Sequence, residues 1–326
     1  MKRIAVLLVL AGGMLLLGKL STFGWRFCGA RQMNGEYGNT LLSQRLKRHV
    51  MVLSDEIGDR SVFRYDRLLQ AQEYLKDQLV SYGYEVKLQT YRARGKEVSN
   101  VIAVNTGRKE PETIVLVGAH YDSCMNPGAD DNASAVAGVL EIARALADQV
   151  TNKTVQFVLF VNEEPPFFHT EMMGSRVYTR TAKARGEAIE AALVLEMIGY
   201  YTDQPGSQRY PPALGMFYPN SGNFIAVVSN FSSGRIKNRV VSLFRKHSEF
   251  PLESISAPGF VSGIDFSDHW SFWQEGYPAV MITDTAFYRN PHYHRLTDTW
   301  QTLDYTRTAE VVRGLTETVT DLAGSF

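Results

Sequence analysis

The chain has 326 residues, of which 44% are hydrophobic and 21% charged, a composition typical of a globular protein with a full core. This length is enough for one large domain or two small ones. Its 34 basic and 34 acidic residues give a formal net charge of zero, so bulk charge indicates no nucleic-acid or other polyanionic partner.

The N-terminal segment differs from the globular pattern. Lys2 and Arg3 precede an uncharged apolar run over Ile4–Gly18. A short basic stretch before such a run is typical of a secretory signal, and the run is short for a membrane span. We expect residues 1–30 to be a signal peptide or an N-terminal membrane anchor. The protein is then periplasmic or extracellular, either released or anchored through residues 4–18.

Cysteine chemistry is limited in this chain. Cys28 and Cys124 are the only two cysteines, which excludes a disulfide framework and a cysteine-based zinc site. The expected role of Cys124 is that of a small buried apolar residue.

After residue 30 the sequence alternates between strand and helix patterns. Short apolar runs predict strands, and longer stretches with apolar residues three and four apart predict helices. The predicted elements, in chain order, are a helix over Tyr65–Ser81, strands over Glu85–Tyr91, Ser99–Val104 and Thr113–Val117, a helix over Ala133–Leu146, strands over Thr154–Val161 and Ala191–Leu195, a helix over Arg235–His247, a strand over Ala279–Thr283 and a helix over Tyr305–Leu322.

This alternation predicts an α/β fold. We expect a three-layer sandwich in which helices flank a mixed, largely parallel central sheet. No linker, repeat or low-complexity stretch interrupts residues 31–326, so we expect a single domain there. Sheets of this kind bind ligands at the carboxyl ends of their strands.

Residues of the kind that bind metals follow the predicted strands. His120 and Asp122 come after the strand that ends at Val117, and Glu163 and Glu164 come after the strand that ends at Val161. Glu196 follows Leu195 directly. Further along, His292 and His294 follow the last predicted strand, and Asp130, Asp131 and Asn132 precede a helix. Because several such residues share one sheet edge, we expect a metal site there.

Each of these residues also has an ordinary structural explanation. A lone His120 is more often a buried structural histidine, but Asp122 can accept its second ring N–H, as beside metal-bound histidines. Asp130 could be a helix N-cap, although a cap needs only one of the three residues 130–132. Glu196 lies within an apolar stretch, so it must be paired, protonated or metal-bound. His292 and His294 alternate, so only one needs to face the site.

Five motifs together resemble the di-zinc exopeptidases of the bacterial leucyl aminopeptidase and aminopeptidase Y type. They are Gly118–Ser123 (GAHYDS), Pro127–Ser134 (PGADDNAS), Asn162–Glu164 (NEE), Leu195–Gly199 (LEMIG) and Tyr293–His294. The resemblance extends over about residues 40–326, with the motifs in the family's order and spacing.

The resemblance implies a role for each matching residue. Asp130 bridges two metal ions, His120 and Glu196 complete the ligands of one ion, and Glu164 and His294 complete those of the other. Glu163 is the general base, and Tyr293 helps to hold the oxyanion. The family also implies a cis peptide bond between Asp130 and Asp131. The implied function is hydrolysis of the N-terminal peptide bond of peptide substrates.

The implied ligands suit zinc. Asp130, Glu164 and Glu196 with one hydroxide balance the charge of two Zn²⁺ ions, and nitrogen and oxygen ligands with open positions are typical of catalytic zinc. Mn²⁺ and Co²⁺ fit the same ligand types. The sequence departs from the family's pattern at Glu196, where many members have aspartate, and at Ala135, where glycine is common.

Three other functions remain open from the sequence. A single-zinc glutaminyl cyclase resembles the same family, although cyclases depart from the Asp130–Ser134 pattern. A carboxypeptidase-like exopeptidase needs a basic clamp, which Arg235, Arg289 or Arg295 could supply. A binding domain without activity would not need five ligands and a base. His269 and Asp298 are second-rank candidates that we expect to shape the pocket.

Overall fold

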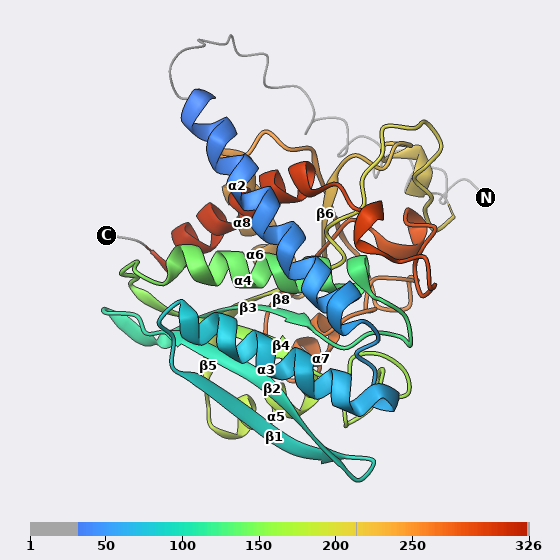
Figure 1. The fold of residues 1–326 in the computed structure, drawn as a ribbon. Coiled ribbons are helices and arrows are strands. Elements are labelled where there is room, and N and C mark those ends of the chain that lie inside the picture. Colours follow the sequence, from blue (N-terminus) through green and yellow to red (C-terminus); the bar gives the residue numbers. More distant parts are fainter. Residues whose placement is uncertain (1–31, 213, 325–326) are drawn as a thin grey trace, which may run out of the picture. The chain divides into compact units, whose positions relative to one another are not determined.

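An eight-stranded sheet organises the part of the chain that the computed structural model describes, residues 32–212 and 214–324 (Figure 1). The strand order across the sheet is β1-β2-β4-β3-β5-β8-β6-β7. The strands are β1 (Val86–Ala93), β2 (Lys96–Asn105), β3 (Glu110–His120), β4 (Lys153–Phe160), β5 (Ala188–Glu196), β6 (Ile225–Ser229), β7 (Leu252–Ser256) and β8 (Ala279–Thr283).

The four central strands β4, β3, β5 and β8 run parallel to one another. Their register places His120 beside Phe160, at the ends of β3 and β4, and Glu196 beside Thr283, at the ends of β5 and β8. The pairs β1–β2, β2–β4 and β6–β8 are antiparallel, and β6–β7 is parallel. The sheet is therefore mixed, and its parallel centre brings four carboxyl ends to one edge.

Helices cover both faces of the sheet. They are α2 (Gln32–Met51), α3 (Tyr65–Ser81), α4 (Ala135–Leu146), α5 (Gly174–Ala184), α6 (Gly234–His247), α7 (His269–Gln274) and α8 (Tyr305–Ala323). On β3, Val115 and Val117 belong to the core beneath α3, α4, α6 and α8, whereas Leu116 belongs to the core beneath α5 and α7. This alternation makes β3 apolar on both faces and confirms the predicted three-layer α/β fold (Figure 1).

Several predicted elements differ from the observed ones. The strand predicted to end at Val117 continues to His120, so the first polar residue of the site is part of the strand itself. The helix predicted from Ala133 begins at Ala135, because Asp131 (φ −101°, ψ 87°) and Asn132 (φ −132°, ψ 31°) are not helical. The strands β6 and β7 and the helices α2, α5 and α7 were not predicted.

The chain divides by its internal contacts into residues 1–37 and a compact unit over residues 38–326. The predicted signal peptide or anchor, residues 1–30, lies outside the described residues. Within the described ranges, no helix combines the length and hydrophobicity needed to cross a membrane. The domain boundary at residue 31 stays a prediction.

Candidate metal centre

His120 begins the site at the carboxyl end of β3. It is buried, and neither of its ring nitrogens makes a hydrogen bond to a described residue. Its Nε2 lies 3.3 Å from Glu196 Oε2 and 3.5 Å from Asp131 Oδ1, and its Nδ1 lies 3.5 Å from Asp122 Oδ1. The imidazole is therefore surrounded by carboxylate oxygens.

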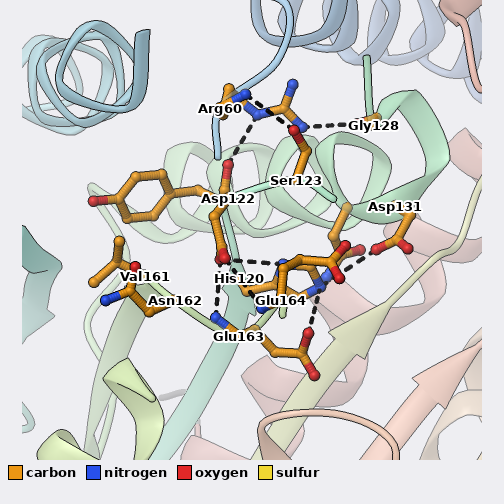
Figure 2. Close-up of polar contacts among 12 residues, drawn as sticks. Arg60, His120, Asp122, Ser123, Gly128, Asp131, Val161, Asn162, Glu163 and Glu164 are labelled. Atoms are coloured by element: carbon orange, nitrogen blue, oxygen red, sulfur yellow. Dashed lines mark hydrogen bonds and ion pairs between the residues drawn. The ribbon is translucent and has the colours of Figure 1, made fainter. Parts of the chain in front are cut away.

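Asp122 joins the ends of β3 and β4. Its Oδ1 accepts a hydrogen bond from the Glu163 amide and its Oδ2 one from the Glu164 amide, both at 3.1 Å (Figure 2). Because Oδ1 also lies beside His120, one carboxylate is close to the imidazole and to the two glutamates together. Asp122 was expected to accept the second ring N–H of His120; Nδ1 and Oδ1 lie 3.5 Å apart and make no hydrogen bond here, so Asp122 lies beside the ring and holds the two glutamate amides.

Asp131 lies between His120 and His294, the two histidines that the sequence predicted as metal ligands. Its Oδ1 is 3.5 Å from His120 Nε2 and its Oδ2 is 3.2 Å from His294 Nε2. One oxygen thus faces each imidazole, which is the arrangement needed for a carboxylate shared between two metal ions. Burial opposes the charge of Asp131, but the two histidines hold its pKa below the ordinary value.

This position was expected of Asp130, and the expectation is corrected. The Asp130 carboxylate is buried on the other side of the chain, where Oδ1 accepts from the Gly199 amide at 2.9 Å and Oδ2 accepts from Asn290 Nδ2 at 2.6 Å. Burial and the neighbouring Asp284 carboxylate raise its pKa well above the ordinary value. Asp130 therefore cannot face the histidines, and the cis peptide bond is likewise Asp131–Asn132.

Glu196, at the end of β5, forms a first group of potential metal ligands together with His120 and Asp131. Its Oε2 accepts hydrogen bonds from Ser267 Oγ at 2.7 Å and Asn132 Nδ2 at 3.3 Å. One donor atom from each of His120, Asp131 and Glu196 lies within 4.8 Å of the other two. Although glutamate is longer than the aspartate common at this position in the family, the Glu196 carboxylate lies beside His120 and Asp131.

Glu164 and His294 form a second group. Glu164 Oε2 lies 3.2 Å from His294 Nε2, and Cys124 Sγ joins them within 4.8 Å. Glu164 Oε1 is buried and has no hydrogen-bond partner in the described structure. Burial, together with the Asp131 charge, raises the pKa of Glu164 to about 7.

Glu163 lies beside both groups without belonging to either. Its Oε2 is 3.8 Å from His120 Nε2, and the side chain is buried. Burial raises its pKa well above the ordinary value, so this carboxylate accepts a proton more readily than a solvent-exposed one.

Tyr293 packs on His294, with ring centroids 3.8 Å apart and an interplanar angle of 17°. The ring therefore supports the imidazole and lies next to the site, as expected. Its phenol makes no hydrogen bond among those found in the described ranges, and burial raises its pKa.

Asp298, His269 and His292 were also singled out from the sequence, and each has a hydrogen-bond partner in the structure. Asp298 accepts hydrogen bonds from the Asp130 and Asp131 amides, at 2.9 and 3.1 Å, so it fixes this turn. His269 is buried with Nε2 2.7 Å from the Ile264 carbonyl oxygen, and burial lowers its pKa to about 4. His292 Nδ1 is paired with Thr297 Oγ1, so His294 is the histidine of this segment that joins the site.

Arg60 is a supporting residue that sequence reasoning missed. It is fully buried and donates five side-chain hydrogen bonds to the carbonyl oxygens of Leu53, Gly58, Tyr121, Pro127 and Gly128. Figure 2 shows the bond to Gly128. These bonds hold the segment between His120 and Asp131 in place. No local pattern marks it, because its partners are backbone groups far along the chain.

Gly128 is required by the same turn. Its φ of 58° lies in the left-handed region, and a Cβ there would be 2.4 Å from the Asp131 carbonyl oxygen. A side chain at this position would displace the backbone that presents Asp131.

An apolar pocket adjoins the site. Glu196 and Tyr293 are among its lining residues, and the cavity has a volume of about 110 Å³. Most of the wall is apolar or aromatic, including Tyr210, Phe224, Val228, Ile264, Met281 and Phe287. A lining of this polarity suits a hydrophobic group.

The residues fit a pair of divalent cations. Asp131, Glu163, Glu164 and Glu196 are all buried within one cluster, and burying so many carboxylates without positive charge is costly. The unpartnered nitrogens of His120 and the unpartnered Oε1 of Glu164 are free to coordinate. Nitrogen and carboxylate donors in two adjacent groups suit zinc.

Comparisons with known proteins agree with this arrangement. The model of a protein family described as Peptidase family M28 matches residues 100–319. YfbL, a protein of Escherichia coli strain K12 described as uncharacterized, is 41% identical over 83% of this chain and 86% of its own length. A probable leucine aminopeptidase of Arthroderma otae is 27% identical over 65% of this chain, which spans about half (54%) of that relative.

Solved structures show the same fold. The LapA aminopeptidase of Legionella pneumophila has a TM-score of 0.68 at 18% identity, covering 96% of this chain and 84% of its own. A glutaminyl cyclase of Fimbriiglobus ruber has a TM-score of 0.63 at 20% identity, covering 85% of this chain and 94% of its own. At these identities the likeness is one of fold.

Proposed function

The chain belongs to peptidase family M28, and we propose that within this family it is a two-zinc aminopeptidase that releases N-terminal residues from peptides. The observation that carries the proposal is the position of Asp131, whose two oxygens each face one histidine–glutamate pair. Glu163 lies beside His120 and is not among the proposed ligands, so its carboxylate is available for proton transfer.

The proposed ligands divide into two sets. His120 and Glu196 would hold one ion, Glu164 and His294 would hold the other, and Asp131 would contribute to both. When bound, two zinc ions supply Lewis acidity toward the peptide carbonyl and lower the pKa of water to about 7. Manganese and cobalt remain alternative metals for these ligands.

Glu163 is the proposed general base. Its carboxylate takes a proton from the attacking water as the water oxygen bonds to the carbonyl carbon. The same carboxyl group then gives that proton to the amine as the C–N bond breaks. Burial supports this role because it raises the pKa of Glu163 toward the working range of a proton shuttle. We assign to Tyr293, which stacks on His294, the role of hydrogen-bonding the developing oxyanion; its position next to the site supports this role.

The apolar pocket supports a substrate preference. A peptide whose scissile carbonyl lies at the metal groups can place its N-terminal side chain between Glu196 and Tyr293, into a wall that includes Phe224, Ile264 and Met281. We therefore propose that large hydrophobic residues are released fastest. The names of the LapA aminopeptidase and the fungal leucine aminopeptidase support cleavage from the N-terminus.

The proposal is tested with a panel of aminoacyl chromogenic amides and zinc measured on the same sample. We expect leucine and phenylalanine amides to be cleaved fastest, two zinc ions per chain, and loss of turnover with a chelator. Glu163→Gln should keep both ions and lower kcat by about 10²–10⁴-fold, the usual contribution of a general base. Near-normal turnover in that variant, or activity without metal, would refute the mechanism.

The same samples separate the alternatives. One zinc ion per chain, with pyroglutamate formed from an N-terminal glutamine peptide, identifies a glutaminyl cyclase, which shares the fold. Cleavage of an N-acetylated peptide from its C-terminus identifies a carboxypeptidase. Among the basic residues that could bind a C-terminal carboxylate, Arg289 donates to Gln208 and to the Phe224 carbonyl oxygen, while its Nη2 has no hydrogen-bond partner among the described residues.

We also propose that the enzyme is exported. The support is the sequence pattern alone, in which Lys2 and Arg3 precede the apolar run Ile4–Gly18. Peptides supplied from outside the cytoplasm would then be its substrates.

A further inference from the structure

Beside the second group of ligands lies a thiol that the proposed chemistry does not use. We infer that Cys124 supplies a sulfur ligand to the metal ion held by Glu164 and His294, so that this ion has nitrogen, oxygen and sulfur donors. The inference rests on the proposed metal-dependent function and extends it, because the expected ligands of both ions were only histidines and carboxylates. It also replaces the buried apolar role expected of Cys124, which is half-buried; one cysteine cannot form an all-cysteine site, but it can join a mixed one.

The donor atoms of three side chains converge at this place. Cys124 Sγ, one Glu164 oxygen and one His294 nitrogen all lie within 4.8 Å of one another. Glu164 gives an independent sign of a missing ligand, because its side chain is 3% exposed and its Oε1 has no hydrogen-bond partner within the described ranges. A cation between these atoms satisfies that oxygen and also takes in the sulfur.

The turn that carries Cys124 is fixed by its neighbours. Ser123 Oγ accepts a hydrogen bond from the Arg60 amide (Figure 2) and donates one to the Asn126 carbonyl oxygen, both at 3.0 Å. The Met125 amide donates to the Ser123 carbonyl oxygen at 3.0 Å, and the Met125 side chain is exposed. Ser123 therefore faces the protein interior and Met125 faces solvent, while Cys124 between them is directed to the metal groups.

A sulfur ligand has consequences that the carboxylates lack. Zinc accepts thiolate at about 2.3 Å, and the thiol proton passes to solvent when the bond forms. Soft sulfur favours zinc and cadmium over manganese, which prefers oxygen. We therefore expect the second position to bind zinc more tightly than a histidine–carboxylate site and to discriminate against manganese.

X-ray absorption at the zinc edge tests the inference directly. The zinc-loaded full chain should show a sulfur scatterer at about 2.3 Å, and Cys124→Ser should lose it. Cys28→Ser is the matched control, because it removes the other cysteine of the chain and should leave the sulfur signal intact. In competition with a chromophoric chelator, Cys124→Ser should bind the second zinc at least about 10-fold more weakly, as expected when a supporting metal contact is lost.

Labelling provides a second readout. In the Cys28→Ser chain, saturating zinc should slow alkylation of Cys124 at least about 10-fold relative to metal-free protein, as expected for a metal-bound thiolate. Two bound zinc ions without a sulfur scatterer would overturn the inference and leave the proposed function standing. Failure of the unsubstituted chain to bind zinc at all would overturn both.

Discussion

Asp130 and Asp131 are neighbours with different tasks. Asp131 presents one oxygen to His120 and one to His294, and Asp130 accepts hydrogen bonds from the Gly199 amide and from Asn290. The backbone at Asp131 leaves the helical region, which turns two consecutive carboxylates to opposite sides. Asp130 is thus a buried structural acid that ties the turn to the segment after β5.

Exchanging each aspartate for asparagine separates these tasks. We expect Asp131→Asn to weaken zinc binding at both positions by more than the about 10–100-fold that loss of a supporting contact costs. Asp130→Asn should still bind two ions, because its amide oxygen can accept from Gly199. Metal content after dialysis against buffered zinc distinguishes the two variants. Loss of both ions from Asp130→Asn, with Asp131→Asn still loaded, would return the shared role to Asp130.

At the scale of elements, parallel strands assemble the site. His120 ends β3, Glu196 ends β5, and Glu163 and Glu164 follow β4. Parallel pairing brings the ends of β3, β4 and β5 to one edge, although these ends lie far apart in the sequence. Helix α4 follows the Asp131 turn directly, and its Glu141 connects it to Arg45 and His49 of α2.

The contact between α4 and α2 predicts a pH-dependent stability. Burial alone would raise the pKa of Glu141, but hydrogen bonds from His49 and Arg45 and the Arg144 charge hold it at about 2. The folded pKa is below the unfolded value of about 4.5, so this stability is present above pH 4.5 and is lost as the pH falls toward 2. Its size is about 3 kcal/mol at most, since Arg45 and Arg144 are partly exposed.

Urea unfolding of Glu141→Gln measures this contribution. At pH 7 the variant should be less stable than the unsubstituted chain by up to about 3 kcal/mol. The difference should shrink steadily between pH 4.5 and pH 2. A difference that stays constant over this interval would show that packing of the side chain, and not its charge, is responsible.

At the scale of the whole molecule, one sheet contributes to both the candidate metal centre and the apolar pocket. The parallel centre of the sheet carries the candidate metal centre, and the strands β6, β7 and β8 contribute part of the pocket wall. Glu196 and Tyr293 line the pocket beside the candidate metal centre, so under the proposed function the substrate side chain and the scissile bond would be positioned together.

The proposed export also concerns the whole chain. Expressed in a bacterial host, the full chain should be found outside the cytoplasm, and a chain lacking residues 4–18 should stay inside and still cleave leucine amide. Fractionation with protease treatment of spheroplasts measures this, and N-terminal sequencing separates a cleaved signal from an anchor. Equal cytoplasmic retention of both chains would refute the proposed export.

By itself the sequence determined the α/β class, the buried strands and the types of residue at their ends. These follow from apolar periodicity and from the position of a polar residue after an apolar run, as for His120 and Glu196. The five-residue strands β6 and β7 escaped because runs this short also suit a helix or loop, and β7 has only two apolar residues, Leu252 and Ile255. Helix α7 escaped because its six residues carry too little of the helical pattern, and α5 escaped because few of its residues are apolar.

Only the tertiary structure decided which aspartate faces the histidines. Asp130 and Asp131 are the same residue type, so the sequence does not distinguish them. The directions of their side chains depend on backbone angles, which are set by contacts with residues far along the chain. Asp298 accepts hydrogen bonds from the amides of both aspartates, and Asn290 donates one to the Asp130 carboxylate. Arg60 donates to the Gly128 carbonyl oxygen in the turn before them. Long-range hydrogen bonds leave no local pattern, so they and the side-chain directions they impose could be read only from the fold.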